Sequence, residues 1–157
     1  MGISGQTKTV VELNKRCLLF YKITGIAMQV HGEYHPGLLE SAYEAAFVYL
    51  LRKNGFRVEE QVNLPMFWRD EVLPKHYCMD LVVGGDTIVE LKAVKYVNNE
   101  HRKQLWNYMH LTHMPFGLLF NFGNESLFSE WYYRRDDGTI TKLTWHNNRL
   151  DNIDEFL

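Results

Sequence analysis

The sequence has little of what secreted and membrane proteins need. Only two of its 157 residues are cysteines, Cys17 and Cys78, which is too few for a disulfide framework or a four-cysteine zinc site. No uninterrupted apolar run reaches the length that spans a membrane. The first residues lack the basic segment and apolar stretch of a secretion signal. We therefore expect a cytoplasmic protein with reduced cysteines and no membrane partner.

An excess of charge of one sign is also missing. Lys and Arg number 17 against 19 Asp and Glu, which gives a formal net charge of −2. Such a chain has no overall basic field to hold nucleic acid nonspecifically, so a nucleic-acid contact requires a local patch. Lys95, Arg102, Lys103 and the pair Arg134-Arg135 are candidates, although most charge clusters are solvated surface.

Internal repeats, low-complexity stretches and linkers rich in Pro, Gly or Ser are absent as well. Hydrophobic residues make up 46% of the chain and charged residues 23%, which is typical of a domain that buries a sizeable core. Because one domain takes roughly 100–200 residues, we expect a single domain over residues 1–157.

Hydrophobic periodicity predicts two helices at the start of the chain. Apolar residues at gaps of three and four predict a helix over 9–30, broken by the segment 31–37. A second helix is expected to begin near Pro36, because proline suits the first helical turn. It should end at Asn54-Gly55, which can supply a left-handed cap.

The period changes to two from residue 57 to 94 and predicts strands. Pro65 and Pro74 indicate edge positions or bulges in the outer strands, and a more central hairpin is expected from 76–83 and 87–94. A helix from Asn98 to about His113 and an apolar strand over 116–122 then complete a parallel crossover. Two more strands, 127–134 and 139–145, are expected at one sheet edge.

The central hairpin carries three charged residues, Asp80, Glu90 and Lys92, inside otherwise apolar strands. Charges in such a place are costly unless they are paired or bind a metal. A three-residue loop, Gly84-Gly85-Asp86, would place Asp80 directly across from Glu90. Lys92 would project from the same face, because side chains alternate along a strand.

This arrangement suits phosphodiester chemistry. Mg²⁺ is usually held by one or two carboxylates together with water and phosphate oxygens, and a bound cation acidifies water. The Lys92 ammonium can offset the negative charge that gathers on a phosphorane-like transition state. The alternative is an ordinary ion pair on a half-exposed strand; the apolar surroundings and the facing acid favour a functional site.

The sequence resembles the PD-(D/E)XK nuclease superfamily, specifically its small GxxExxY group of mostly uncharacterised prokaryotic proteins. Between about Ile26 and Gly123, the resemblance rests on motifs whose order and spacing together are specific: Val30-His31, Gly37-Leu38-Leu39-Glu40-Ser41-Ala42-Tyr43, Gln61, Met79-Asp80, Glu90-Leu91-Lys92, Gln104 with Tyr108, Gly117-Leu118-Leu119 and Asn121-Phe122-Gly123. Met79 stands where the namesake motif has a proline, which is not a metal ligand.

The resemblance implies a mixed α/β fold, the restriction-endonuclease-like αβββαβ core, with a central mixed sheet flanked by helices. Here it would carry an added N-terminal helix and extra C-terminal edge strands. It further implies a Mg²⁺- or Mn²⁺-dependent nuclease in which Asp80 and Glu90 hold the metal and Lys92 stabilises charge. Glu40 would add a metal ligand or hold a metal-bound water, and Gln104 would meet phosphate or water. The implied substrate is nucleic acid, with DNA as the expected form.

Other interpretations remain open from the sequence. A noncatalytic module of the same fold, acting as an adaptor for nucleic acid or protein, agrees with the near-neutral charge. A homodimer would supply missing basic surface. The pairs His110/His113 and His76/Cys78 have spacings that can begin a zinc site, but neither has a second pair at a familiar distance. Tyr108 is expected to pack against the sheet with its hydroxyl bonded.

Overall fold

A computed structural model describes residues 2–151, with side chains from residue 9 onward. The elements follow one another in the order α1 (Gly2–Tyr34), α2 (Glu40–Lys53), β1 (Val58–Trp68), β2 (Glu71–Val83), β3 (Thr87–Lys92), α3 (Asn99–Thr112), β4 (Phe116–Asn121), β5 (Phe128–Arg134), β6 (Ile140–Leu143), β7 (Trp145–His146) and β8 (Arg149–Leu150). No helix within residues 2–151 is long and apolar enough to cross a membrane.

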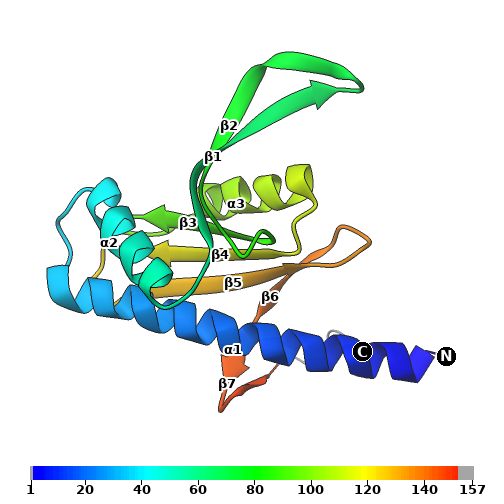
Figure 1. The fold of residues 1–157 in the computed structure, drawn as a ribbon, viewed down its shortest axis with the longest axis horizontal. Coiled ribbons are helices and arrows are strands. Elements are labelled where there is room, and N and C mark those ends of the chain that lie inside the picture. The colour runs from blue at the N-terminus through cyan, green and yellow to red at the C-terminus, as the bar shows by residue number, and fades with distance from the viewer. Residues whose placement is uncertain (1, 152–157) are drawn as a thin grey trace.

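Strands β1 to β6 form one mixed sheet in sequential order. Only the β3–β4 pair is parallel, because α3 makes the crossover between them; the other neighbours are antiparallel. The segment from α2 to β4 thus runs αβββαβ, preceded by α1 and followed by the strands β5 and β6 at one edge (Figure 1). The fold class expected from the sequence is confirmed.

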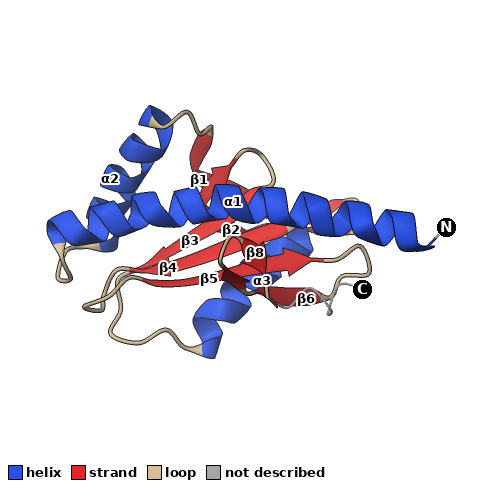
Figure 2. Ribbon diagram, turned by 90° about the horizontal axis from the view of Figure 1, so that it is seen from below, coloured by secondary structure: helices blue, strands red, loops and turns tan. Residues whose placement is uncertain are grey.

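Helices cover both faces of the sheet and divide the core into two clusters. The long α1 crosses one face together with α2 (Figure 2), and the apolar cluster there includes Phe20, Phe47, Leu91 and Phe120. On the opposite face, α3 packs through Leu105, Tyr108 and Met109 against a cluster that includes Ile88 and Leu119. The sheet therefore separates the two clusters, and the expected crossover through α3 covers the face opposite α1 and α2.

The connection between α1 and α2 differs from the expectation. The first helix continues through the predicted break at residue 31 to Tyr34 and ends where His35 adopts φ 56°. The second helix begins at Glu40 rather than near Pro36. Tyr43 explains the shift, because its hydroxyl donates to the His35 carbonyl and accepts from the Leu38 N–H at 3.1 Å, so that the turn is built around this side chain.

The β1–β2 hairpin projects beyond the rest of the sheet (Figure 1). β2 pairs with β3 only from Leu81 to Val83, whereas β1 follows β2 over almost its full length. The pairing shifts between Pro65 and Phe67, at the position where a proline removes a hydrogen-bond donor. The bulge expected from Pro65 is therefore confirmed, and the arm carries Phe67 and Trp68 exposed at its tip.

The C-terminal strands agree with the expectation in part. β5 and β6 form the outer edge, as predicted, but β6 stops at Leu143. Trp145, expected in the same strand, pairs instead with Leu150 in the small β7–β8 ribbon.

Candidate active site

The hairpin register brings Asp80 and Glu90 together. Val83 pairs with Thr87 across the loop Gly84-Gly85-Asp86, and the pairing ends at Leu81 and Val89. Asp80 and Glu90 come next along the two strands. The Asp80 N–H donates to Glu90 Oε1 at 3.0 Å, and the Leu91 N–H donates to Asp80 Oδ2 at 2.9 Å. Each carboxylate is thus fixed by a backbone amide of the opposite strand.

A bend in β1 lies beside Asp80. Glu60 pairs with Leu81 and Val62 with Met79, so Gln61 lies opposite Asp80, and it has φ 48°. On one side of the bend, Leu81 packs in the cluster under α1; on the other, Val62 and Met79 pack in the cluster under α3. The strands therefore rotate at Asp80, where the arm leaves the sheet. A left-handed φ at a residue other than glycine is a strained conformation that gathers at functional sites.

Glu90 is an acid in the protein core. Its side chain is only 2% exposed, and burial, together with the neighbouring Asp80 carboxylate, raises its pKa well above the usual value, although Lys92 opposes the shift. Two carboxylates at close range disfavour each other's ionisation. A bound cation would relieve both the burial and the repulsion, so this donor pair fits a divalent metal.

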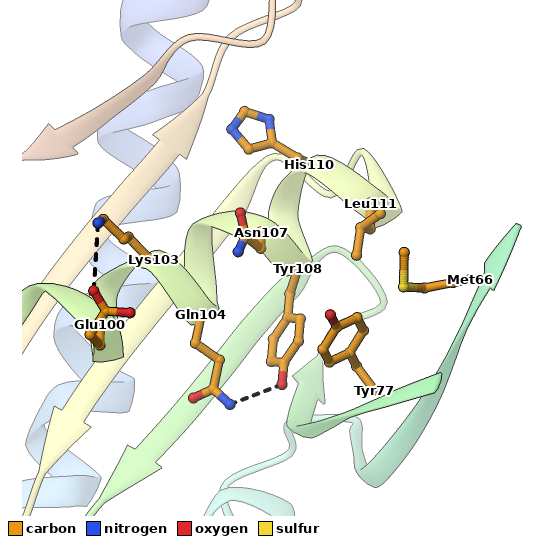
Figure 3. A pocket seen from close by; sticks show the side chains of 9 residues that line it. All are labelled: Met66, Tyr77, Glu100, Lys103, Gln104, Asn107, Tyr108, His110 and Leu111. Atoms are coloured by element: carbon orange, nitrogen blue, oxygen red, sulfur yellow. Dashed lines mark hydrogen bonds and ion pairs between the residues drawn. The ribbon is translucent and has the colours of Figure 1, made fainter. Parts of the chain in front are cut away.

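Lys92 lies on the same side of the sheet as Glu90 and contacts α3. Its Nζ donates to Gln104 Oε1 at 2.8 Å, and Gln104 Nε2 donates to the Tyr108 hydroxyl at 3.1 Å (Figure 3). Tyr108 is buried with its hydroxyl bonded, as expected. Gln104 therefore holds the ammonium in place, while the remaining two protons of Lys92 stay available to other acceptors.

The end of β3 beyond Lys92 is held by Asn121 of the neighbouring strand. The buried Asn121 amide accepts from the Val94 N–H at 3.0 Å and donates to the Val94 carbonyl at 2.9 Å. At Gly123 an added Cβ would lie only 2.1 Å from the Val94 carbonyl oxygen. These contacts fix the chain immediately after the lysine.

Helix α2 contributes Glu40 and a second acid, Glu44, one turn later. Burial and then the Asp80 charge raise the pKa of both carboxyls, and Lys92 opposes the shift at Glu40. Gln61 donates to Glu44 Oε1 at 2.8 Å, while its own carbonyl accepts from the exposed Cys78 thiol at 3.1 Å. The strained residue opposite Asp80 thus orients a carboxylate of α2.

Sequence reasoning missed Glu44. The spacing from Glu40 was the available signal, because residues four apart share one face of a helix. Gln61 belongs to the motif set, yet its bond to Glu44 follows from the bend in β1 and not from any local spacing.

Four of the expected site residues are linked to one another, and the fifth, Glu40, interacts with them through charge alone. Asp80, Glu90, Lys92 and Gln104 are linked through hydrogen bonds or through the Asp80–Glu90 and Glu90–Lys92 charge interactions, and Glu40 interacts electrostatically with Asp80 and Lys92. Among the described side chains, no group of three or more His, Cys, Asp or Glu forms a ready metal site. Asp80 and Glu90 are the two carboxylates in direct contact, and Glu40, within electrostatic reach of Asp80, stays a predicted further ligand.

Two of the basic residues singled out from the sequence, Arg102 and Lys103, are paired with acids. Arg102 is bonded to Glu130 of β5 at 2.8 Å, and Lys103 lies 3.5 Å from Glu100 on the same helix. This part of the helix therefore offers less free positive charge than the sequence indicates.

The family comparison agrees with this geometry. A family model described as the PD-(D/E)XK nuclease superfamily matches residues 18–134. The chain belongs to this superfamily. Its members generally act on nucleic acid and use divalent metal ions. The matched range contains Asp80, Glu90 and Lys92 and extends from α1 to the end of β5. No curated protein matches the chain.

Proposed function

We propose that the protein is a metal-dependent nuclease that hydrolyses phosphodiester bonds of nucleic acid, with DNA as the first substrate to test, and that it belongs to the GxxExxY group of the superfamily. The observation that carries the proposal is the Asp80–Glu90 pair, two carboxylates in contact at the edge of an apolar core with Lys92 beside them. A buried acid beside a second carboxylate, with a raised pKa that one lysine only partly offsets, suits a ligand that supplies positive charge.

Each residue has a role in this proposal. Asp80 and Glu90 hold the cation, Mg²⁺ or Mn²⁺, which when bound acidifies water and polarises the phosphate. Lys92, held by Gln104 and close enough to Glu90 to lower the pKa of that acid, would offset the negative charge that develops on the phosphate oxygens. Glu40, whose pKa is raised by burial and by the Asp80 charge, would add a metal ligand or hold a metal-bound water.

Labelled single- and double-stranded DNA and RNA test the proposal, incubated with the protein in Mg²⁺, Mn²⁺ or EDTA. We expect metal-dependent cleavage that falls by about 10²–10³-fold in Lys92→Ala, the usual cost of losing one transition-state donor. Lys53→Ala removes an exposed lysine from the last turn of α2 and should cleave as the wild type does. Cleavage that persists equally in Lys92→Ala would overturn the proposal and reveal a contaminating nuclease.

The second candidate is a noncatalytic adaptor of the same fold, and the pairing of Arg102 with Glu130 favours it, because little free basic surface remains on α3. Under this alternative, none of the four substrates is cleaved in any metal. Metal binding that depends on Asp80, measured by calorimetry, would then still separate a metal-binding module from an inert one.

A further inference from the structure

A groove begins at Gln104, the hydrogen-bond partner of Lys92, and extends away from Asp80 and Glu90. It has a volume of about 510 Å³ and lies between α3 and the projecting β1–β2 arm (Figure 3). Gln104 and Tyr108 line it at the end nearest Lys92, and Leu111 lies one helical turn farther on, next to Met66 of the arm. The groove therefore adjoins the candidate active site at Gln104, which bonds Lys92.

The two walls of the groove differ in chemistry. The arm contributes an apolar wall, the Met66 side chain and the Tyr77 ring, which point toward α3. The helix contributes the exposed Asn107 amide, with Gln104, whose amide bonds Lys92 and Tyr108, at one end and the apolar Leu111 beyond. An apolar and aromatic surface opposite amide donors and acceptors suits a flat heterocycle with polar edges, which is the chemistry of a nucleobase.

Positive charge lies at the margins of this groove. Lys75 Nζ is 5.1 Å from the centre of the Tyr77 ring, and Lys103 lies on the α3 side, where Glu100 partly offsets it. A nucleotide in the groove would therefore have its base against Tyr77 and its phosphate within reach of an ammonium. A volume of this size lies in the ordinary range for a small-ligand site, roughly 300–1,000 Å³.

From these contacts we infer that the groove binds a nucleotide of an unpaired strand next to the bond to be cut, so that the substrate is single-stranded, or locally unpaired, nucleic acid. A base between the two walls presents its pairing edge to Asn107 and cannot pair with a second strand. The inference rests on the proposed nuclease function and names its substrate class.

Binding of fluorescent strands in EDTA tests the groove without cleavage. The probes are single strands of about 15 nucleotides, dT and rU, and a blunt DNA duplex of the same length, followed by fluorescence anisotropy. We expect single strands to bind more tightly than the duplex, and Tyr77→Ala to weaken single-strand binding at least about 5-fold, the lower range for loss of one stacked base. Tyr77→Phe keeps the ring and should bind within about 2-fold of the wild type.

Two further variants guard against an effect of folding. Asn107 is exposed on α3, so Asn107→Glu leaves the core intact while placing a negative charge in the groove, and it should also weaken single-strand binding. Tyr49→Ala removes a tyrosine that is 66% exposed on α2, outside the groove, and should change nothing. The comparison of dT with rU shows whether a DNA or an RNA strand is preferred, since the two probes differ in the 2′-hydroxyl and in the C5 methyl of the base. Tight binding of either supports the groove.

Three results would overturn the inference: no binding of single strands by the wild type, duplex binding that is equally tight and equally sensitive to Tyr77, or groove variants that bind single strands as the wild type does. Metal-dependent cleavage lost in Lys92→Ala would leave the proposed function standing in each case. Conversely, Tyr77-dependent binding without any cleavage would support the groove and count against the nuclease.

Discussion

Two glutamates of the sheet lie in one row and have opposite surroundings. Glu90 of β3 pairs with Leu119 of β4, and Leu119 pairs with Glu130 of β5, so the two acids are separated by one strand on the same face. Both are buried, with 2% and 7% of their surface exposed. Equal burial in one layer of one sheet makes them a natural comparison.

Glu130 is neutralised from within the chain. Arg102 donates to both of its oxygens, with Nε at 2.9 Å and Nη2 at 2.8 Å, the Tyr132 hydroxyl donates as well, and Lys142 Nζ lies 3.9 Å away. Burial alone would raise the pKa of Glu130, but these hydrogen bonds hold it below the usual value. Its charge is therefore balanced without a ligand.

Glu90 has the opposite balance. Its nearest charged partner is another acid, Asp80, and the opposing effect of Lys92 is the smaller one, so the pKa is raised. The contrast teaches that burial does not mark a functional acid. What distinguishes Glu90 as a candidate is that the charges around it leave its pKa raised, whereas those around Glu130 lower the pKa of that acid.

The largest difference between the two regions is expected in the free energy of unfolding when the basic side chain beside each acid, Arg102 or Lys92, is replaced. Arg102→Met leaves Glu130 buried without its main partner and should lower the free energy of unfolding by about 3 kcal/mol. Lys92→Met removes a half-exposed ammonium and should cost less than about 1 kcal/mol. Urea denaturation in EDTA at pH 7 measures both. The double variant Arg102→Met/Glu130→Gln should recover part of the loss, and similar losses in the two single variants would contradict the contrast.

The next effect is stabilisation by metal. Mg²⁺ or Mn²⁺ at about 100 times its dissociation constant should raise the free energy of unfolding of the wild type by about 2.7 kcal/mol. At pH values below the raised pKa of Glu90, binding should also release a proton, because the acid then carries a proton that it must lose to bind metal. Calorimetry in two buffers of different ionisation enthalpy detects the release.

Matched variants assign that stabilisation to one region. Asp80→Asn should abolish the metal effect, whereas Glu130→Gln should keep it, since Glu130 is bonded to Arg102. Metal stabilisation that survives in Asp80→Asn would place the cation elsewhere in the protein.

The region around Glu90 could be predicted from the sequence because its geometry is local. Alternating apolar residues and a three-residue loop determine which face Asp80, Glu90 and Lys92 share, and the structure has that loop and register. The order of strands and helices predicted the parallel crossover in the same way, and the family resemblance implied the fold class.

The region around Glu130 could not be predicted in this way, because its partner is distant in the chain. Arg102 lies 28 residues before Glu130, and the sequence alone grouped it with Lys95 and Lys103 as a possible phosphate track. The hydrogen bond from Gln61 to Glu44 could not be predicted for a related reason, since it depends on the left-handed φ of Gln61 and on how α2 packs. Long-range packing decides both contacts, and short-range patterns do not encode it.

The smallest expected effect is a difference in the sign of pH dependence. The raised pKa of Glu90 means that its contribution to stability is complete below the ordinary glutamate pKa and is lost as pH rises through the folded-state pKa. Glu130 has a lowered pKa, so its contribution is present above the ordinary value and is lost as pH falls through the folded-state pKa. The two acids should therefore destabilise the protein at opposite ends of the pH range.

Glutamine variants measure this difference directly in metal-free buffer. Glu90→Gln should match the wild type near pH 4 and become the more stable of the two as pH rises through the raised pKa of Glu90. Glu130→Gln should be less stable than the wild type at pH 7, with a deficit that shrinks below about pH 4. Thermal unfolding across this range gives both slopes. Slopes of the same sign would mean that the surroundings shift the pKa of both acids in the same direction. That result would contradict the proposal that the Asp80–Glu90 pair binds an external cation.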